Sequence, residues 1–361
     1  MKENILARTA RLRAAMAEYG ADAFVFIDEE GTNWESLFYM SGFRGTSGAL
    51  VVYPDGADLV LDGRYVQQGR EQSPHSIVEQ KNGLCDDVKT MLLRHGSKRI
   101  YCEASRTFHS LWKKLETYDA EWRDGTEWIK TLRRTKDAEE ISSIRSAAAI
   151  GAHAFLETLD DVKEGMTEKE FESMLNYRIC RAGGETGFDM IVASGPRSSM
   201  PHGRATARKI ARGETVTVDF GARSGGYFCD ITRNFSIGEP NEKASALHAL
   251  LLNAHRDAAS ELKAGASGKE AHSTALAVLE SEGVGKYFTH SLGHSFGLEI
   301  HEYPVLSPRR DDTLKTGDVV TVEPGIYIEG WGGLRLEDDY LVLDGKAERL
   351  TKELEQKFFQ V

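Results

Sequence analysis

Hydrophobic and polar positions in the first part of the chain switch repeatedly between strand-like and helix-like spacing. Short runs rich in Val, Ile and aromatic residues predict strands, because such side chains favour a pleated, half-buried backbone. These runs are residues 22–28, 48–54, 57–62 and 98–103. Apolar residues three and four positions apart predict helices between them. The helical stretches are residues 4–19, 64–73 and 84–95. Residues 1–127 are therefore predicted to form a small α/β domain.

The rest of the chain has more helical patterns first and more strand patterns later. A Ser, Thr or Asp followed three residues later by Glu predicts a helix start, because each side chain can satisfy a free backbone N–H of the first turn. Such pairs are Asp137 with Glu140, Thr167 with Glu170, and Ser267 with Glu270. Strands are predicted at residues 215–220, 227–237, 319–323 and 334–343. Helices on a curved antiparallel sheet give an α+β domain over residues 137–361, after a linker at 128–136.

Length, charge and cysteine content narrow the class of protein. A chain of 361 residues suggests two domains. The net charge of −11 argues against nucleic acid as the main partner, since phosphate binding needs a basic face. No apolar run approaches the roughly 20 residues of a membrane span, and the amphipathic first 19 residues lack the apolar core of a signal peptide. Four scattered cysteines without a CxxC pair suggest a reduced, cytoplasmic protein.

One sequence frame occurs twice and carries the candidate chemistry. Residues 213–221 read GETVTVDFG and residues 317–325 read GDVVTVEPG, with a carboxylate six positions after the first glycine. Each frame is followed by a Gly-Gly pair and, four residues later, by a second carboxylate. The four acidic residues are Asp219, Asp230, Glu323 and Glu337. The duplication predicts two halves of a sheet related by a pseudo-twofold axis, with these carboxylates near the axis.

A histidine-rich segment, HSLGHSFGLEIHE at residues 290–302, lies between the two frames. His290 and His294 would share a face of an extended segment, and Gly293 and Gly297 argue against a helical HExxH motif. A single acidic strand residue is more often a turn or cap residue. Two matched pairs of carboxylates are harder to explain by packing, because buried unpaired carboxylates are costly without cations. Oxygen-rich ligands with one or two histidines favour Mn²⁺-like ions, and four carboxylates balance two divalent ions.

Several blocks resemble the pita-bread metallopeptidases, in particular the aminopeptidase P and prolidase branch. The blocks are VDFGARSGGYFCDITR, HSLGHSFGLEIHEYP, VTVEPGIYI and GGLRLEDDYLV. FDMIVASGPRSSMPHGRA at 188–205 and TKDAEEISSIRSAA at 135–148 extend the likeness, and SGFRGTSGALVV and LDGRY extend it more loosely. The resemblance covers nearly the whole chain. It implies a pita-bread catalytic domain preceded by a creatinase-like N-terminal domain, and by analogy a homodimer.

The resemblance also implies roles for individual residues. Two divalent ions are expected, with Mn²⁺ favoured and Co²⁺, Fe²⁺ or Zn²⁺ as alternatives. Their ligands would be Asp219, Asp230, His294, Glu323 and Glu337, with Asp230 and Glu337 bridging. Glu323 would also act as general base and acid, and His202 and His290 would stabilise the tetrahedral intermediate. Substrate contacts would come from His301 and Arg309. Arg335 would support the site or bind a substrate carboxylate, and Tyr327 is a weaker candidate for a supporting contact.

The implied activity is an exopeptidase that hydrolyses the Xaa-Pro bond through a hydroxide bridging the ions. Dipeptides and the N-termini of longer short peptides both remain open as substrates, since the same ligands serve both. Two other readings are a non-catalytic pita-bread module that binds proteins and a metal-free amidinohydrolase like creatinase. The complete set of acidic residues counts against both.

Overall fold

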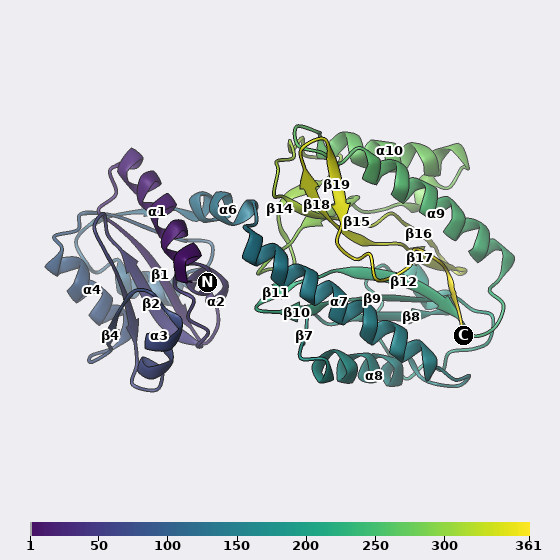
Figure 1. Cartoon of the computed structure of the whole chain (residues 1–361), viewed down its shortest axis with the longest axis horizontal. Helices are drawn as coiled ribbons and strands as arrows, with labels where there is room; N and C mark the ends of the chain where they lie inside the picture. Colours follow the sequence, from purple (N-terminus) through teal and green to yellow (C-terminus); the bar gives the residue numbers. More distant parts are fainter. Residues whose placement is uncertain (1) are drawn as a thin grey trace. The chain divides into compact units, whose positions relative to one another are not determined.

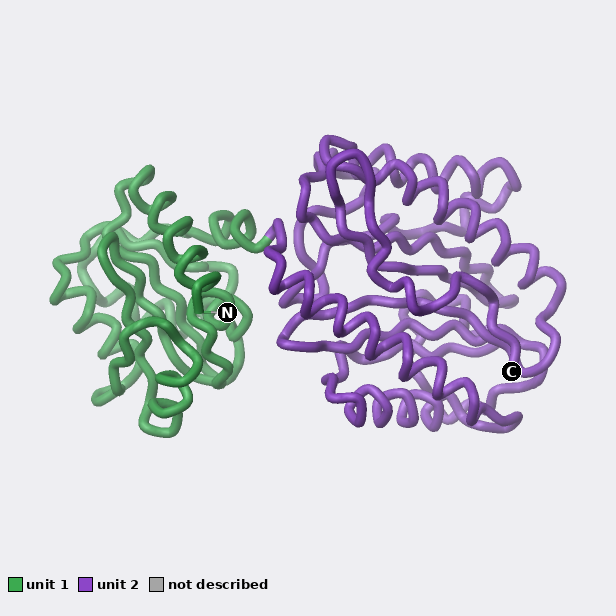
Figure 2. The backbone as a smooth tube through the Cα atoms, viewed as in Figure 1, with its two compact units in different colours: residues 1–133 green, residues 134–361 purple. Residues whose placement is uncertain are grey.

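The chain divides into two units, one ending at Arg133 and the other starting at Arg134 (Figure 2). The computed structural model describes residues 2–361. Helix α6 (Thr126–Arg134) occupies most of the stretch that the sequence suggests as a linker. Among the helices in residues 2–361, none is both long and apolar enough to cross a bilayer.

The N-terminal unit is built on a mixed sheet with the strand order β4-β3-β2-β1-β5-β6. Central strand β1 (Ala23–Glu29) is antiparallel to β2 and parallel to β5. The other strands are β2 (Ser47–Val52), β3 (Ala57–Leu61), β4 (Ser76–Glu79), β5 (Arg99–Cys102) and β6 (Glu121–Asp124). The helices before α6 are α1 (Lys2–Tyr19), α2 (Trp34–Ser41), α3 (Val66–Gln72), α4 (Leu84–Arg94) and α5 (His109–Leu115). Every strand and helix predicted for this unit is present.

Strands β4 and β6 escaped the sequence prediction. Both lie at the edges of the sheet, and none of their residues is fully buried. Edge strands are commonly short and charged, which protects them from pairing with other chains. A run such as EWRD in β6 therefore lacks the apolar alternation by which an inner strand is predicted.

The C-terminal unit contains the predicted α+β fold with two similar halves (Figure 1). Each half begins with a pair of helices, α7 (Ala138–Asp160) with α8 (Glu168–Arg181), and α9 (Glu242–Ser260) with α10 (Gly268–Ser281). Both reciprocal hydrogen bonds of a capping box form at Asp137 and at Thr167. At Ser267 the hydroxyl accepts from the N–H of Glu270, without the reciprocal bond.

The strands of the C-terminal unit repeat in the same order in both halves. In the first half β9 (Val216–Phe220) is antiparallel to β12 (Ile231–Ser236), and a hairpin of β10 (Ala222–Ser224) and β11 (Tyr227–Phe228) joins them. In the second half β15 (Val319–Val322), the β16 (Gly325–Ile328) and β17 (Gly332–Arg335) hairpin, and β18 (Asp338–Leu343) repeat this order. The remaining elements are β7 (Glu185–Thr186), β8 (Ile191–Ser194), η1 (Gly195–Ser199), η2 (Gly285–Tyr287), β13 (Gly293–Ser295), β14 (Glu302–Leu306), β19 (Lys346–Arg349) and β20 (Phe359–Gln360).

Two strands predicted as continuous are each interrupted at a candidate metal ligand. The predicted strand 227–237 breaks between β11 and β12 at Asp230, and the predicted strand 334–343 breaks between β17 and β18 at Glu337. The N–H of Glu337 donates to the carbonyl of Thr232 in the other half of the domain, at 3.2 Å. This contact between the halves replaces the pairing that a continuous strand would make.

Two histidines on α9 should make the stability of the fold depend on pH. His248 and His255 are buried, and burial lowers the pKa of each to about 4. Their pKa in the unfolded chain is about 6.5, so below that pH the unfolded state binds protons that the folded state does not. We expect the free energy of unfolding to decrease by about 1.4 kcal/mol per pH unit for each histidine as the pH falls towards 4.

Urea unfolding at a series of pH values measures this slope. His248→Gln should reduce the slope by about 1.4 kcal/mol per pH unit, the contribution of one proton. The same change at exposed His153 should leave the slope unchanged. Equal slopes for the wild type and the His248→Gln variant would contradict the prediction.

Candidate active site

A cavity of about 620 Å³ lies in the C-terminal unit, within the size range of small-ligand sites. It is lined by every residue expected to be a metal ligand, and by three further histidines and one buried arginine. These residues are Asp219, Asp230, His294, Glu323, Glu337, His202, His290, His301 and Arg335. The duplicated frame therefore does bring its four carboxylates to one place.

Strand ends and breaks position these side chains. Asp219 lies in β9 and His294 in β13, Glu323 directly follows β15, and Asp230 and Glu337 occupy the two breaks. The glycine before His294 permits a close approach of β13 to β15. A Cβ on Gly293 would lie 2.0 Å from the carbonyl oxygen of Thr321. Any other residue at this position would therefore push the two strands apart.

The candidate ligands are close enough to share a cation. Asp230, His294 and Glu337 each offer an atom within 4.8 Å of the others. His294 Nε2 lies 3.6 Å from Asp230 Oδ2 and 3.5 Å from Glu323 Oε1. Its Nδ1 donates to the carbonyl of Ser295 at 3.2 Å. A histidine held in this way presents the lone pair of Nε2, the arrangement typical of metal-binding histidines.

The electrostatics of the cluster also fit bound cations. Burial, together with the neighbouring carboxylates, raises the pKa of Asp230 and of Glu323 well above the usual range and that of Glu337 to about 8. Asp219 Oδ1 and Asp230 Oδ1 are buried without a hydrogen-bond partner among residues 2–361. Buried carboxylates in this state are unfavourable unless they hold protons or bind cations. Their oxygen atoms suit Mn²⁺-like divalent ions better than thiolate-seeking ones.

Arg335 is hydrogen-bonded to the carboxylate cluster. Its side chain is buried, and its Nη2 donates to Asp219 Oδ2 at 2.6 Å. Its Nε donates to Thr232 Oγ1, which in turn donates to Glu337 Oε2 at 2.6 Å. Arg335 thus holds Asp219 directly and contacts the hydroxyl that holds Glu337.

His290 is connected to Arg335 through Tyr327. Arg335 Nη1 donates to the Tyr327 hydroxyl at 2.7 Å, and that hydroxyl lies 3.0 Å from His290 Nε2. His290 Nδ1 lies 2.8 Å from the carbonyl of Ser291, so Nδ1 carries the proton and Nε2 accepts from Tyr327. Burial lowers the pKa of His290 to about 4, which keeps the ring neutral.

The other two histidines lie on the cavity wall. The ring of His301 packs 4.5 Å from that of His294, and burial lowers the pKa of His301. His202 is exposed in the segment after β8. Apolar side chains complete the wall, and they are Phe188, Ile191, Ile300 and Val305.

Arg309 does not line the cavity, although the sequence suggests it as a contact for a substrate carboxylate. It is exposed beyond β14, where its backbone N–H donates to Ser307 Oγ. Arg204, two residues after His202, does line the cavity, although it was not among the residues suggested by the sequence. Its guanidinium pairs with Asp189 at 2.8 Å, and the two side chains are 74% and 73% exposed.

Matches to protein families agree with this fold and cavity, which together define a two-domain metallopeptidase. Residues 142–344 match the model of metallopeptidase family M24, and residues 8–135 match the creatinase/prolidase N-terminal domain. The chain belongs to metallopeptidase family M24.

Known proteins resemble the chain over most of its length. It is 36% identical to an Xaa-Pro dipeptidase of Pyrococcus furiosus, across 88% of this chain and 91% of that protein. A crystal structure of an X-Pro aminopeptidase from Thermotoga maritima has a TM-score of 0.92 and 37% identity, over 95% and 98% of the two chains. An Xaa-Pro dipeptidase structure from Bacillus anthracis has a TM-score of 0.93 and 36% identity, over 99% and 100%.

Proposed function

We propose that this chain is a metal-dependent exopeptidase that hydrolyses the bond before proline in dipeptides and at the N-termini of short peptides. The observation that carries the proposal is the cavity, in which five candidate ligands, three further histidines and an apolar wall meet. Relatives named Xaa-Pro dipeptidase and X-Pro aminopeptidase support the choice of substrate.

The proposed cofactor is a pair of divalent ions, with Mn²⁺ favoured by the donor set. The ligands would be Asp219, Asp230, His294, Glu323 and Glu337, with Asp230 and Glu337 shared between the ions. Such a pair would supply a water of lowered pKa as the nucleophile at neutral pH. The four carboxylates supply the negative charge that two divalent ions need.

The remaining residues would transfer or donate protons, or would contact the substrate. Glu323 would take the proton of the attacking water and give it to the departing proline nitrogen. His202, on the cavity wall, would donate to the oxygen of the scissile carbonyl. His290 would contact the same region, with its orientation set by Tyr327 and Ser291. His301 would pack against the proline side of the substrate.

Arg204 is proposed as the contact for a free C-terminal carboxylate. It is an exposed cation on the cavity wall, and its partner Asp189 is equally exposed. Arg335, by contrast, is buried and already engaged by Asp219 and Tyr327. A dipeptide would bring its C-terminal carboxylate into the cavity, where the exposed guanidinium could exchange Asp189 for it.

Hydrolysis of Ala-Pro and Ala-Pro-Ala by the Mn²⁺-loaded protein tests the proposed function. We expect both to be cleaved before proline, and Ala-Ala to be cleaved far more slowly. Cleavage of the tripeptide alone would narrow the activity to an aminopeptidase. If neither proline peptide is cleaved, the function is wrong and a binding module becomes the better reading.

Arg204→Gln should raise KM for Ala-Pro about tenfold, the equivalent of about 1.4 kcal/mol for a charge-assisted hydrogen bond. KM for the amide Ala-Pro-NH₂, which lacks the carboxylate, should stay the same. Arg309→Gln is the matched control and should change neither value. An effect of Arg309→Gln equal to that of Arg204→Gln would contradict the assignment.

The homodimer and the cytoplasmic location suggested by the sequence stay predictions. Light scattering of the purified chain measures the first, and fractionation of cells that produce it measures the second.

A further inference from the structure

The segment that carries His202, residues 195–206, connects β8 to the residues before β9. We call it the His202 segment. Pro201, His202 and Arg204 from this segment line the cavity. Apart from the short helix η1 and an isolated β-bridge between Ile191 and Arg204, the segment has no regular structure. Side-chain contacts therefore add to this bridge in holding the segment in place.

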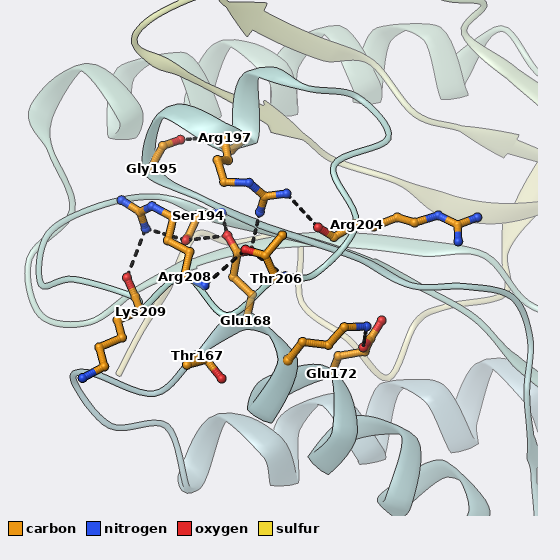
Figure 3. Close-up of polar contacts among 12 residues, drawn as sticks. Thr167, Glu168, Glu172, Ser194, Gly195, Arg197, Arg204, Thr206, Arg208 and Lys209 are labelled. Atoms are coloured by element: carbon orange, nitrogen blue, oxygen red, sulfur yellow. Dashed lines mark hydrogen bonds and ion pairs between the residues drawn. The ribbon is translucent and has the colours of Figure 1, made fainter.

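The carboxylate of Glu168 binds both ends of the His202 segment (Figure 3). Glu168 is the first residue of α8, and its side chain is fully buried. Its Oε1 accepts from Ser194, just before the segment, from the N–H at 2.8 Å and the hydroxyl at 2.7 Å. Its Oε2 accepts from Thr206, at the other end, from the N–H at 2.9 Å and the hydroxyl at 2.7 Å. One carboxylate thus ties together backbone groups twelve residues apart.

Arg197 extends this contact towards His202. Its Nη1 donates to Glu168 Oε2, and its Nη2 donates to the carbonyl of Arg204 at 2.7 Å. The side chain of Arg204 points away from the cluster (Figure 3). Gly203, next to His202, fits tightly as well, because a Cβ there would lie 2.9 Å from Cβ of Ala193. The backbone on the C-terminal side of His202 is therefore held through the Glu168–Arg197 pair.

The charge of Glu168 is maintained despite its burial. Burial alone would raise its pKa, but the hydrogen bonds from Thr206 and Ser194 outweigh this and lower the pKa below its usual value. A buried carboxylate with this many donors is a strong acceptor, and charge-assisted hydrogen bonds are about twice as strong as neutral ones.

The second half of the domain shows that the fold does not require a carboxylate at this helix position. Glu168 follows the capping residue Thr167, and Gly268 follows the capping residue Ser267 in α10. The segment near Gly268 follows His301, and its own Asp312 accepts from the Tyr303 hydroxyl at 2.9 Å and from the N–H of Val305 at 3.2 Å. At the start of that helix the N–H of Gly268 donates to the carbonyl of Asp312, and the hydroxyl of Ser267 donates to Asp311 at 2.6 Å. The carboxylate on α8 is therefore specific to the His202 half.

We propose that Glu168 is a positioning residue, which sets the place of His202 in the cavity by holding both ends of the His202 segment. This inference rests on the function proposed for His202. Among the described residues Glu168 does not line the cavity and makes no hydrogen bond or ion pair with a candidate metal ligand, so its effect is expected to reach catalysis through the His202 segment, which carries His202 and Arg204.

A double-mutant cycle with Glu168→Gln and His202→Ala tests the inference. Glu168→Gln should lower kcat/KM for Ala-Pro-NH₂, which lacks the carboxylate that Arg204 is proposed to contact, about tenfold to a hundredfold, the range expected when a reacting group is misplaced by about 1 Å. The Mn²⁺ content should stay that of the wild type. In the His202→Ala background the same change should lower kcat/KM less than about twofold, because non-additivity marks residues that act as a unit. Full additivity, or parallel loss of Mn²⁺, would overturn the proposal.

Two further variants keep the test decisive. Glu170→Gln alters the neighbouring capping residue, whose carboxylate binds Thr167 and not the His202 segment, and kcat/KM should not change. Thr206→Val removes a single donor to Glu168, and should act in the same direction as Glu168→Gln with a smaller effect. If Glu168→Gln does not fold, equal kcat/KM for Thr206→Val and the wild type would overturn the proposal.

An NMR measurement separates this inference from the proposed function. With ¹³C-labelled histidine, the ring signal of His202 is identified by its absence in His202→Ala. Glu168→Gln should shift this signal and leave that of His153 unchanged, whether or not any peptide is cleaved. An unshifted His202 signal would contradict the positioning role, whereas inactivity of the wild type towards both proline peptides would contradict only the function.

Discussion

Asp230→Asn is expected to lower kcat/KM for Ala-Pro by about a hundredfold or more, because Asp230 is the proposed ligand of both divalent ions and two-metal catalysis would depend on it. Asp230 is buried in the break between β11 and β12, 3.6 Å from Nε2 of His294. An asparagine keeps the shape of the side chain but loses a charge that would help to balance the two proposed divalent ions. Elemental analysis after Mn²⁺ loading should find fewer ions per chain than in the wild type.

The same variant should have the opposite effect on the metal-free protein. Burial, followed by Glu337 and Asp219, raises the pKa of Asp230 well above the usual range, so the carboxyl is unfavourable in its charged form. Removing it should leave the thermal midpoint in EDTA unchanged or higher, while Mn²⁺ should stabilise the variant less than the wild type. Asp161→Asn, at an exposed side chain paired with Arg178, is the control and should change neither metal content nor activity. Full metal content and activity in Asp230→Asn would rule out the dinuclear site.

Arg233→Met should reduce the free energy of unfolding by about 3–5 kcal/mol, the usual cost of breaking a buried ion pair. Arg233 in β12 and Asp338 in β18 are both fully buried and 2.6 Å apart. Arg233 Nη1 also donates to the carbonyl of Glu337 at 2.6 Å. Methionine would fill much of the space but would leave Asp338 without its closest cation. Urea unfolding of the metal-free protein measures the loss.

Two further variants distinguish this cost from a general effect of losing an arginine. Arg145→Met breaks a pair with Glu348 whose side chains are 38% and 35% exposed, and should cost less than about 1 kcal/mol. Adding Asp338→Asn to Arg233→Met should restore part of the stability, since the uncompensated charge is then removed. Equal losses for Arg233→Met and Arg145→Met would show that burial does not govern the strength of this pair.

Local signals explain why so much of the fold was predictable. The strand β1 is buried along almost its whole length, so its apolar run is unbroken. The capping boxes at Asp137 and Thr167 involve residues three apart, and such contacts are encoded within one turn. Edge strands β4 and β6 were missed because each pairs with a strand on one side only. Their side chains are not fully buried, so their sequences need no run of apolar residues.

The candidate ligands were predictable for a similar reason. Each frame is a strand, a tight hairpin and a second strand, so the spacing of its two carboxylates is set within about twenty residues. The breaks at Asp230 and Glu337 were not predictable, since Glu337 pairs with Thr232 across 105 positions of sequence. Arg309 and Arg204 show the same limit. Both are plausible cations beside a site histidine, and only the path of each loop places Arg204 on the cavity wall.

The sequence by itself determined the two-domain α+β plan, the repeated acidic frame and the set of groups that a metallopeptidase site requires. Periodicity, capping and repetition are properties of neighbouring residues, and each can be read within a short window. The tertiary structure alone decided how three further charged residues are placed around that site. It buried Arg335 behind Asp219, left Arg204 exposed on the cavity wall, and placed Glu168 beneath the His202 segment. These placements depend on contacts between segments that are far apart in the sequence. The burial and hydrogen bonding that stabilise such contacts cannot be predicted from a short stretch of residues.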